Sequence, residues 1–277
     1  MKRLAVLGQP ITHSRSPAMQ NAALGRLGLA GEWSYEAIEV APDRFAETVR
    51  GMPERGFVGA NVTIPHKRAA LEVAERASDT AVEIGAANTL SFGPEGIEAR
   101  NTDASGLIAA LPESPRGARA LVLGAGGAAR AAIWGLRRAG AEVIVWNRTA
   151  ERAVAVADEL GASALADGED PDLQRGDLLV NATAIGLHPN PADSSPATLL
   201  ALGFPLERLA AGLIVVDLVY GDAETALVRT AREQGAKVVE GREILVQQGA
   251  ESLQIWTGLK APLSTMREAA GSALGRR

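Results

Sequence analysis

The chain has 277 residues, 47% hydrophobic but only 4% aromatic, so it is long enough for two domains whose cores are built mainly from Ala, Val, Leu and Ile. It contains no cysteine, which excludes disulfides, thiolate nucleophiles and cysteine-based zinc sites. The formal net charge of −5 argues against nucleic-acid binding. We find no signal-peptide pattern and no apolar run long enough for a membrane span, and we therefore expect a cytoplasmic protein.

In the first part of the chain, short apolar runs alternate with segments of helical pattern, which predicts an α/β domain. Pro17 takes an early position in the first helix, where its missing N–H costs nothing, and Pro65 ends a strand. The expected strands are Leu4–Leu7, Trp33–Val40, Gly59–Ile64, Thr89–Phe92 and Ile97–Arg100, the last two as a hairpin, and the expected helices are Ser16–Leu27, Arg44–Arg50 and Arg68–Glu75.

A second α/β unit is expected after Leu111–Gly117, a segment with two prolines and a glycine that is typical of a connector. Residues 186–198, which are rich in Gly, Pro, Asn and Ser, are expected to form a loop. The expected strands are Arg119–Leu123, Glu142–Trp146, Asp177–Asn181, Leu213–Val219 and Lys237–Glu240, and the expected helices are Ala128–Ala139, Thr149–Leu160, Glu224–Gln234, Ile244–Thr257 and Ser264–Leu274.

The second unit opens on a glycine pattern that is typical of dinucleotide binding. Gly124, Gly126 and Ala129 fit G-x-G-x-x-A between an apolar strand and a helix. The first glycine permits the tight turn, the second lets the backbone approach a pyrophosphate, and the alanine allows close packing of helix on strand. Backbone N–H groups and the helix dipole then favour the phosphates. We assign the segment Gly124, Ala125, Gly126, Gly127 and Ala128 to this site, the alternative being a glycine-rich turn without a ligand.

The end of the next strand indicates which dinucleotide binds. A site for NAD usually has an acidic residue there, which bonds the ribose 2′-hydroxyl. This chain has Asn147, Arg148 and Thr149 instead. Because an arginine forms charge-assisted bonds to a 2′-phosphate, we predict NADP as the cofactor. The alternative is that Arg148 only solvates the start of a helix.

Polar residues of the first unit suit a small polyhydroxylated acid. Ser14 and Ser16 stand two residues apart before a helix, so that in extended backbone their hydroxyls face one side and the helix dipole favours an anion there. The alternative is that Ser16 is only the N-cap of the helix.

Further polar residues follow one strand and its neighbours. Asn61 and Thr63 alternate with apolar residues at a strand end, and Lys67, Asn88 and Asp103 come after them. Amides and hydroxyls suit a polyol, and a lysine–aspartate pair suits proton transfer to an alkoxide. The alternative for Lys67 is a surface lysine at a helix start. The three histidines are scattered, and no metal site is predicted.

Taken in order, these motifs resemble the shikimate dehydrogenase family over nearly the whole chain. The matching stretches are Gly8-Gln9-Pro10-Ile11, Ser14-x-Ser16-Pro17, Asn61-Val62-Thr63-Ile64-Pro65-x-Lys67, Gly85-Ala86-x-Asn88-Thr89, Asn101-Thr102-Asp103, Gly124-x-Gly126-Gly127, Asn147-Arg148-Thr149, Asn181-Ala182-Thr183-x-x-Gly186, Asp217-x-Val219-Tyr220 and Gln248-Gly249-Ala250.

The resemblance implies an N-terminal α/β substrate domain and a Rossmann-type NADP-binding domain, with the C-terminal helices returning to the first domain. The implied boundaries are 1–104 with 241–277 for the substrate domain and 105–240 for the NADP domain. It also implies a role for each matching position: Ser14 and Ser16 bind the shikimate carboxylate; Asn61, Thr63, Asn88, Asp103 and Gln248 bond its hydroxyls; Lys67 and Asp103 form the catalytic pair; Thr183 belongs to the cofactor site; Gly241 lies near the nicotinamide and Tyr220 near both ligands.

The implied reaction is the reversible NADPH-dependent reduction of 3-dehydroshikimate to shikimate by a monomer or homodimer. Two departures from the family pattern, Gly221-Asp222-Ala223 after Tyr220 and Ile244 near the nicotinamide, bear on cofactor fit and rate. The alternatives are a quinate/shikimate dehydrogenase, which also uses quinate or NAD, and a non-catalytic ligand sensor, which would lack the lysine–aspartate pair. Other two-domain enzymes, such as folate dehydrogenases, share the architecture but give no reason for Ser14, Ser16 and Gln248.

Overall fold

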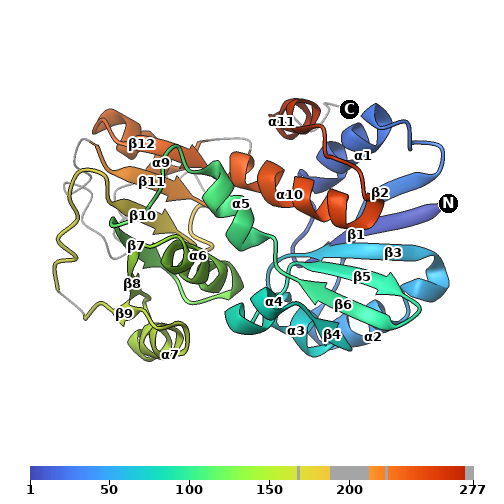
Figure 1. Ribbon diagram of the computed structural model, residues 1–277, viewed down its shortest axis with the longest axis horizontal. Coiled ribbons are helices and arrows are strands. Elements are labelled where there is room, and N and C mark those ends of the chain that lie inside the picture. Colours follow the sequence, from blue (N-terminus) through green and yellow to red (C-terminus); the bar gives the residue numbers. More distant parts are fainter. Residues whose placement is uncertain (167–168, 188–211, 222–223, 272–277) are drawn as a thin grey trace. The chain divides into compact units, whose positions relative to one another are not determined.

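The structure is a computed structural model that describes residues 1–166, 169–187, 212–221 and 224–271. The chain forms two compact units, Met1–Gly106 with Leu245–Arg277, and Leu107–Ile244 (Figure 1). Each unit has its own six-stranded sheet. The predicted fold class is confirmed, including the return of the C-terminal helices to the first unit.

The sheet of the first unit mixes parallel and antiparallel pairs. Its order is β2-β1-β3-β5-β6-β4, with β1 parallel to β2 and β3, and β5 antiparallel to β3 and β6. A tight turn joins the antiparallel strands β5 and β6, and the parallel pairs need crossover connections. The strands are β1 (Lys2–Gly8), β2 (Trp33–Glu39), β3 (Phe57–Val62), β4 (Arg76–Ala77), β5 (Thr89–Gly93) and β6 (Gly96–Arg100).

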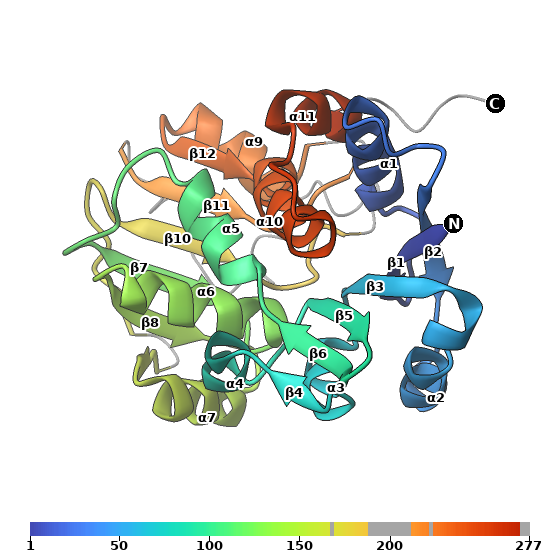
Figure 2. The same ribbon diagram turned by 45° about the vertical axis from the view of Figure 1, so that its right-hand side comes forward.

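Helices flank this sheet and cover an apolar core that includes Leu7, Phe45 and Leu90. In both views the last described helix, α11, lies beside the first, α1 (Figures 1 and 2). The helices are α1 (Ser16–Arg26), α2 (Phe45–Arg50), α3 (Lys67–Glu72), α4 (Asp79–Ile84), α5 (Asp103–Ala110), α10 (Gly241–Thr257) and α11 (Leu263–Gly271), and two short 3-10 turns are η1 (Pro42–Arg44) and η2 (Pro53–Arg55).

The sheet of the second unit is parallel throughout, in the order β12-β11-β10-β7-β8-β9. Counted from the first strand of the unit, this is the 3-2-1-4-5-6 order of dinucleotide-binding sheets, in which ligands bind outside the carboxyl ends of the strands where the order reverses. Here the reversal falls between β7 and β10. The strands are β7 (Arg119–Leu123), β8 (Glu142–Trp146), β9 (Ser163–Ala164), β10 (Leu178–Asn181), β11 (Ile214–Asp217) and β12 (Lys237–Glu240).

The central strands of this sheet are buried on both faces, as parallel strands require, and helices α6 (Gly127–Arg138), α7 (Ala150–Leu160) and α9 (Ala226–Glu233) pack on them. Their apolar residues form the cores expected from Ala, Val, Leu and Ile. Ile244 lies in one of these cores. Among the helices described, none is long and apolar enough to cross a membrane.

Some elements differ from the sequence expectations. Helices α4 and α5 and the two-residue strands β4 and β9 were not expected. The division between the units falls within α5, at Gly106 and Leu107, and again within α10. The segment Leu111–Gly117 therefore lies inside the second unit, and the prediction that it connects the units is wrong. The predicted loop at 186–198 lies mostly outside the described residues.

Candidate active site

The topology of the first sheet brings four polar segments to one edge. The ends of β1 and β3 are neighbours, with Leu7 paired to Val62. Strand β5 begins opposite the end of β3, where Thr89 pairs with Asn61, and β6 ends opposite the start of β5, where Arg100 pairs with Thr89. The segments after β1, after β3, before β5 and after β6 consequently share this edge.

Lys67 and Asp103 form an ion pair at this edge. Lys67 Nζ donates to Asp103 Oδ2 over 2.7 Å, and each side chain is only 12% exposed. Lys67 is the first residue of α3 and Asp103 the first of α5. The preceding His66 is buried: its Nε2 lies 2.7 Å from the Val40 carbonyl, its ring stacks on Phe45, and burial lowers its pKa. His66 thus fixes the start of the helix that carries Lys67.

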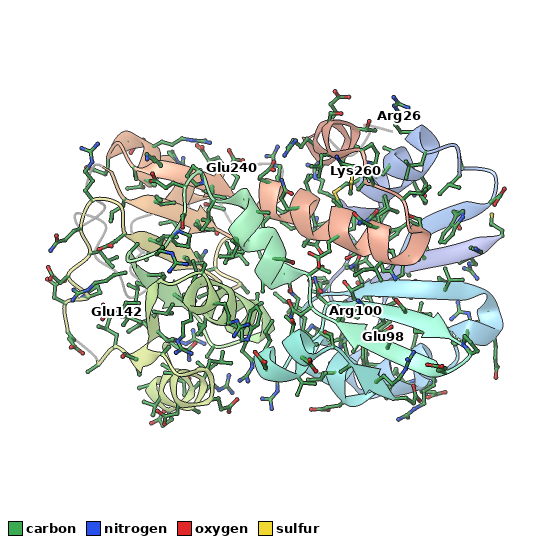
Figure 3. All side chains as sticks on the ribbon, viewed as in Figure 1. Arg26, Glu98, Arg100, Glu142, Glu240 and Lys260 are labelled. Atoms are coloured by element: carbon green, nitrogen blue, oxygen red, sulfur yellow. The ribbon has the colours of Figure 1, made fainter. Side chains whose placement is uncertain are left out.

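Asn88 lies at the centre of the cluster and holds Asp103. Its Nδ2 donates to Asp103 Oδ1 over 2.9 Å, with Thr102 Oγ1 at 3.0 Å and Gln248 Oε1 at 3.1 Å also in reach. Its Oδ1 accepts from the Thr102 backbone N–H over 2.8 Å. One oxygen of Asp103 is therefore bound to the amide, which leaves the other oxygen to Lys67. Arg100, at the end of β6, pairs instead with Glu98 (Figure 3).

Gln248 reaches the cluster from α10 because α5 and α10 pack closely. A Cβ built on Gly106 would lie 2.7 Å from the Gln248 Cβ, so only glycine permits this approach. Gln248 Nε2 donates to the Leu245 carbonyl over 2.9 Å. Helix α10 thus packs on the segment that begins with Asp103 and brings Gln248 to residues 146 and 160 positions earlier in the chain.

Asn61 belongs to the same network, but the protein uses most of its hydrogen-bonding capacity. Tyr35 OH donates to its Oδ1 over 2.8 Å, and its Nδ2 donates to Ser252 Oγ over 2.9 Å. One lone pair of Oδ1 remains for a ligand. Sequence reasoning missed Tyr35 and Ser252 as members of the network. Ser252 follows Gln248 by four residues, one helical turn, and that spacing was a usable signal.

Ser14, Ser16 and Thr63 make no hydrogen bond to this network within the part of the chain that the structure describes. Arg15, between the two serines, has helical dihedrals, so the predicted extended backbone is wrong there. Ser14 Oγ instead accepts from the Ser16 backbone N–H over 3.3 Å. No side chain caps α1, so Ser16 does not serve as the N-cap. The hydroxyls of Ser16 and Thr63 have no partner among the described residues.

The glycine loop of the second unit has the geometry that a phosphate requires. Gly124 has φ of +114°, and a Cβ there would lie 3.0 Å from the Ala182 carbonyl oxygen. A Cβ on Gly126 would meet no atom within 4 Å. The protein itself therefore leaves the space above Gly126 open, and no side chain caps the N-terminus of α6 that follows. Open space and uncapped N–H groups fit the pyrophosphate of a dinucleotide.

The residues after β8 present cationic and hydroxyl groups to solvent. Asn147 Nδ2 donates to the Thr149 carbonyl over 2.9 Å and closes the turn before α7. Arg148 and Thr149 are exposed, and the Thr149 side chain does not cap α7. The Arg148 guanidinium makes no ion pair with a described residue. Arg152, in the first turn of α7, is also exposed and was missed by sequence reasoning, although it follows Arg148 by one helical turn.

The last three predicted residues lie near the carboxyl ends of β10 and β11. Thr183 Oγ1 donates to Asn181 Oδ1 over 2.7 Å. A Cβ on Gly241 would lie 2.6 Å from the Leu218 carbonyl oxygen, so the protein backbone itself requires glycine there. Tyr220 is half-buried in the second unit, beside a cavity of about 230 Å³.

The amino-acid sequence is similar to those of known proteins over its whole length. The chain is 44% identical over 280 residues to the shikimate dehydrogenase (NADP(+)) of Methanothrix thermoacetophila, covering 100% of this chain and 99% of the relative. The chain belongs to the shikimate dehydrogenase family. The shikimate dehydrogenase (NADP(+)) of Methanopyrus kandleri is 43% identical over 280 residues, covering 96% of this chain and 93% of the relative.

Family models and solved structures agree with this assignment. Residues 6–90 match the shikimate dehydrogenase substrate binding domain, residues 109–187 match shikimate / quinate 5-dehydrogenase, and residues 241–270 match the shikimate 5′-dehydrogenase C-terminal domain. The crystal structure of shikimate 5-dehydrogenase from Thermus thermophilus in complex with NADP(H) and shikimate superposes with a TM-score of 0.84 at 42% identity, covering 98% of each chain. The family that the sequence motifs resemble is thereby confirmed.

Proposed function

We propose that this chain is an NADP-dependent shikimate dehydrogenase, which catalyses the reversible reduction of 3-dehydroshikimate to shikimate. The observation that carries the proposal is the Lys67–Asp103 pair, 2.7 Å apart and largely shielded from water. A non-catalytic sensor has no need of this pair. The domain roles follow: 1–104 with 241–277 binds the substrate and 105–240 binds the cofactor.

Substrate recognition falls to the polar edge of the first sheet. Ser14 and Ser16 bind the carboxylate at the N-terminus of α1, where the helix dipole favours an anion. Thr63 offers a hydroxyl without a protein partner among the described residues. The remaining hydrogen-bonding groups for the ring hydroxyls are Asn61, Asn88, Asp103 and Gln248. Tyr220 is assigned to the substrate as well.

The proton moves through Lys67. In the reducing direction the Lys67 ammonium donates a proton to the oxygen of the ketone as that oxygen becomes an alkoxide, and a neutral amine remains. In the oxidising direction the neutral amine accepts the hydroxyl proton. Asp103 orients the ammonium with Oδ2, and Asn88 holds Asp103 by Oδ1. A placed proton donor of this kind accelerates a reaction by about 10²–10⁴-fold.

The cofactor site is assigned to the carboxyl ends of the second sheet. NADP supplies or accepts the hydride when bound. The loop Gly124–Ala128 offers backbone N–H groups to its pyrophosphate, because Gly126 leaves the space above the backbone open. Asn147, Arg148 and Thr149 face its adenosine end, Thr183 joins the same strand edge, and Gly241 is assigned to the nicotinamide end.

The preference for NADP over NAD rests on charge. No carboxylate stands at the end of β8 to repel a 2′-phosphate, and the exposed Arg148 carries a planar guanidinium suited to phosphate oxygens. The first turn of α7 carries a further positive charge on Arg152 beside the negative charge of Glu151. The guanidinium of Arg148, which has no carboxylate partner among the described residues, favours the dinucleotide that carries the 2′-phosphate.

The test is the absorbance of reduced nicotinamide with shikimate or quinate, each supplied with NADP⁺ or NAD⁺. Rapid reduction with shikimate and NADP⁺ alone is the expected result. Comparable rates with quinate or NAD⁺ would move the assignment to a broader quinate/shikimate dehydrogenase. Binding of both ligands without turnover in any pair would favour a sensor. We place the enzyme in the cytoplasm as a monomer or homodimer, which light scattering and cell fractionation test.

A further inference from the structure

Asp217, the last residue of β11, is a completely buried carboxylate to which the function above gives no role. Its exposed fraction is 0%. No lysine or arginine among the described residues forms an ion pair with it. Burial raises its pKa to about 6, against the lowering effect of the hydrogen bonds it accepts. Burying an ionisable group costs free energy of folding unless hydrogen bonds compensate for the lost water.

Three segments of the second unit donate to this one carboxylate. Oδ1 accepts from Asn181 Nδ2 over 2.9 Å and from the Val219 backbone N–H over 3.1 Å. Oδ2 accepts from Thr225 Oγ1 over 2.6 Å. Asn181 ends β10, Val219 follows β11, and Thr225 is the N-cap of α9. Asp217 therefore ties together the chain segments that leave two neighbouring strands.

The bond to Asn181 continues into the loop that carries Thr183. Asn181 Oδ1 accepts from the backbone N–H of Thr183 over 3.1 Å and from its hydroxyl over 2.7 Å. Thr183 Oγ1 in turn accepts from the Ile185 backbone N–H over 3.1 Å. This loop touches the glycine loop, since a Cβ on Gly124 would lie 3.4 Å from Thr183 Cγ2. A continuous chain of contacts thus leads from Asp217 to the assigned dinucleotide site.

The bond to Val219 acts in the same way on the second loop. Val219 is buried, and the next residue is Tyr220, the residue of this unit assigned to both ligands. Because Asp217 accepts the Val219 N–H, the backbone direction at Tyr220 is set by the same carboxylate that sets Thr183. Both loops leave the carboxyl ends of parallel strands, where this class of sheet binds its ligand.

We propose that Asp217 is a positioning residue for the cofactor: it holds the loops after β10 and β11 in the arrangement that binds NADP. The proposal rests on the proposed function, which places NADP at this edge of the sheet. Asp217 itself touches no ligand in this account. It acts through Asn181 and Val219.

A second buried aspartate of the same sheet supplies a matched control. Asp177 lies just before β10, at the opposite, amino end of the strands. It is also buried, and it accepts from the backbone N–H groups of Arg119 and Gln174, each over 2.8 Å. Loss of Asp177 removes hydrogen bonds from the fold but none from the loops at the cofactor edge.

The experiment measures the dissociation constants of NADP⁺ and of shikimate by calorimetry for the wild type, Asp217→Ala, Asp217→Asn and Asp177→Ala. Asp217→Ala is expected to weaken NADP⁺ binding by about tenfold or more and to leave shikimate binding within about twofold. Asp217→Asn retains an acceptor for Asn181 and Val219 and is expected to recover most of the affinity. Asp177→Ala is expected to leave the NADP⁺ affinity unchanged.

The opposite results would overturn the proposal in distinguishable ways. NADP⁺ affinity of Asp217→Ala within about twofold of the wild type removes the role of Asp217, as does an equal loss in Asp177→Ala, which would indicate a general effect on stability. A wild type that binds no NADP⁺ overturns the proposed function and this inference with it. If Asp217→Ala does not fold, Asn181→Ala breaks the same link to Thr183 and is held to the same tenfold loss.

Discussion

Replacement of Asp217 by Asn should change how the stability of the second unit depends on pH. The substitution keeps the size of the side chain and removes its ionisation. The hydrogen-bonding partners of Asp217 are all neutral. Thr225 lines a cavity of about 230 Å³, and the charged side chains that line the same cavity are Glu224, Arg232, Glu240 and Arg242. Arg232 forms ion pairs with both Glu224 and Glu240, so these charges largely compensate each other. Glu240 is the last residue of β12 (Figure 3).

The direction of the effect follows from the raised pKa. Burial raises the pKa of Asp217 to about 6 from an ordinary value of 3.8. Between these values the folded protein binds a proton at Asp217 that the unfolded chain does not. The free energy of unfolding therefore falls as the pH rises through this window and reaches its full loss above about pH 6. A difference of about two pKa units, at about 1.4 kcal/mol for each unit, corresponds to about 3 kcal/mol.

The assay compares the two proteins at the same pH, so that all other titrating groups cancel. The free energy of unfolding is measured by urea denaturation at several pH values from about 4 to about 7, and amide hydrogen exchange in β10 and β11 reports on the second unit alone. The free energy of unfolding of Asp217→Asn relative to that of the wild type is expected to grow by about 2–3 kcal/mol across this range. Parallel pH curves for the two proteins would refute the reasoning, because they would mean that Asp217 does not titrate in this window.

Three further predictions concern the proposed active site. Lys67→Ala should lower turnover by about 10²–10⁴-fold with a smaller change in shikimate affinity. Lys67→Arg should lose turnover too, because arginine does not release its proton. A loss of shikimate affinity with normal turnover, in steady-state kinetics, would remove Lys67 from proton transfer. Arg148→Ala should raise the KM for NADPH far more than the KM for NADH, and an unchanged ratio would exclude Arg148 from the 2′-phosphate site. Gly241→Ala should destabilise the protein by about 1–3 kcal/mol in denaturant titrations, because the added Cβ would lie 2.6 Å from the Leu218 carbonyl oxygen. A Cβ added at Gly126 would meet no atom within 4 Å, so Gly126→Ala should keep the stability of the protein and weaken NADP⁺ binding. The reverse pattern would contradict both assignments.

Much of the fold follows from local sequence signals. Most strands and helices lie within a few residues of their expected positions, because apolar runs and glycine or proline boundaries mark them. Helix α4 was missed although its signals are present: Ser78 caps it by accepting from the Ala81 N–H over 3.2 Å, and Gly85 ends it in left-handed conformation. The two-residue strands β4 and β9 carry no such signal, since they exist only through pairing with β6 and β8.

Helix α5 shows why the connector between the units was expected at the wrong segment. Its eight residues, Asp103–Ala110, are mostly small and apolar, and no helical periodicity separates them from the end of the strand before them. What stabilises α5 is its contact with α10, made close by Gly106 against Gln248. That contact joins residues far apart in the sequence, so the prolines and glycine of Leu111–Gly117 were the stronger local signal and led to the wrong connector.

The residues of the candidate site that have the functional groups for the reaction were predictable from the sequence. The residues that only hold them in place by hydrogen bonds were not. Lys67, Asn88, Asp103 and Gln248 were named from motifs, and the structure places them within hydrogen-bonding distance of one another. The supporting Ser252 was not named, since a serine in a helix has many ordinary uses. Only the fold shows that its hydroxyl lies 2.9 Å from Asn61 Nδ2.

The direction of the hydrogen bonds explains which residue type stands at the centre of each network. Asn88 must donate to Asp103 and also accept from the Thr102 N–H. An amide does both from one side chain, whereas an ionised carboxylate there would repel Asp103 and compete for Lys67. Asp217 accepts from three donors and donates to none, so a carboxylate satisfies them all. The first network therefore keeps a single negative charge opposite the lysine that moves the proton, while the second tolerates a buried charge at a place where no proton has to move.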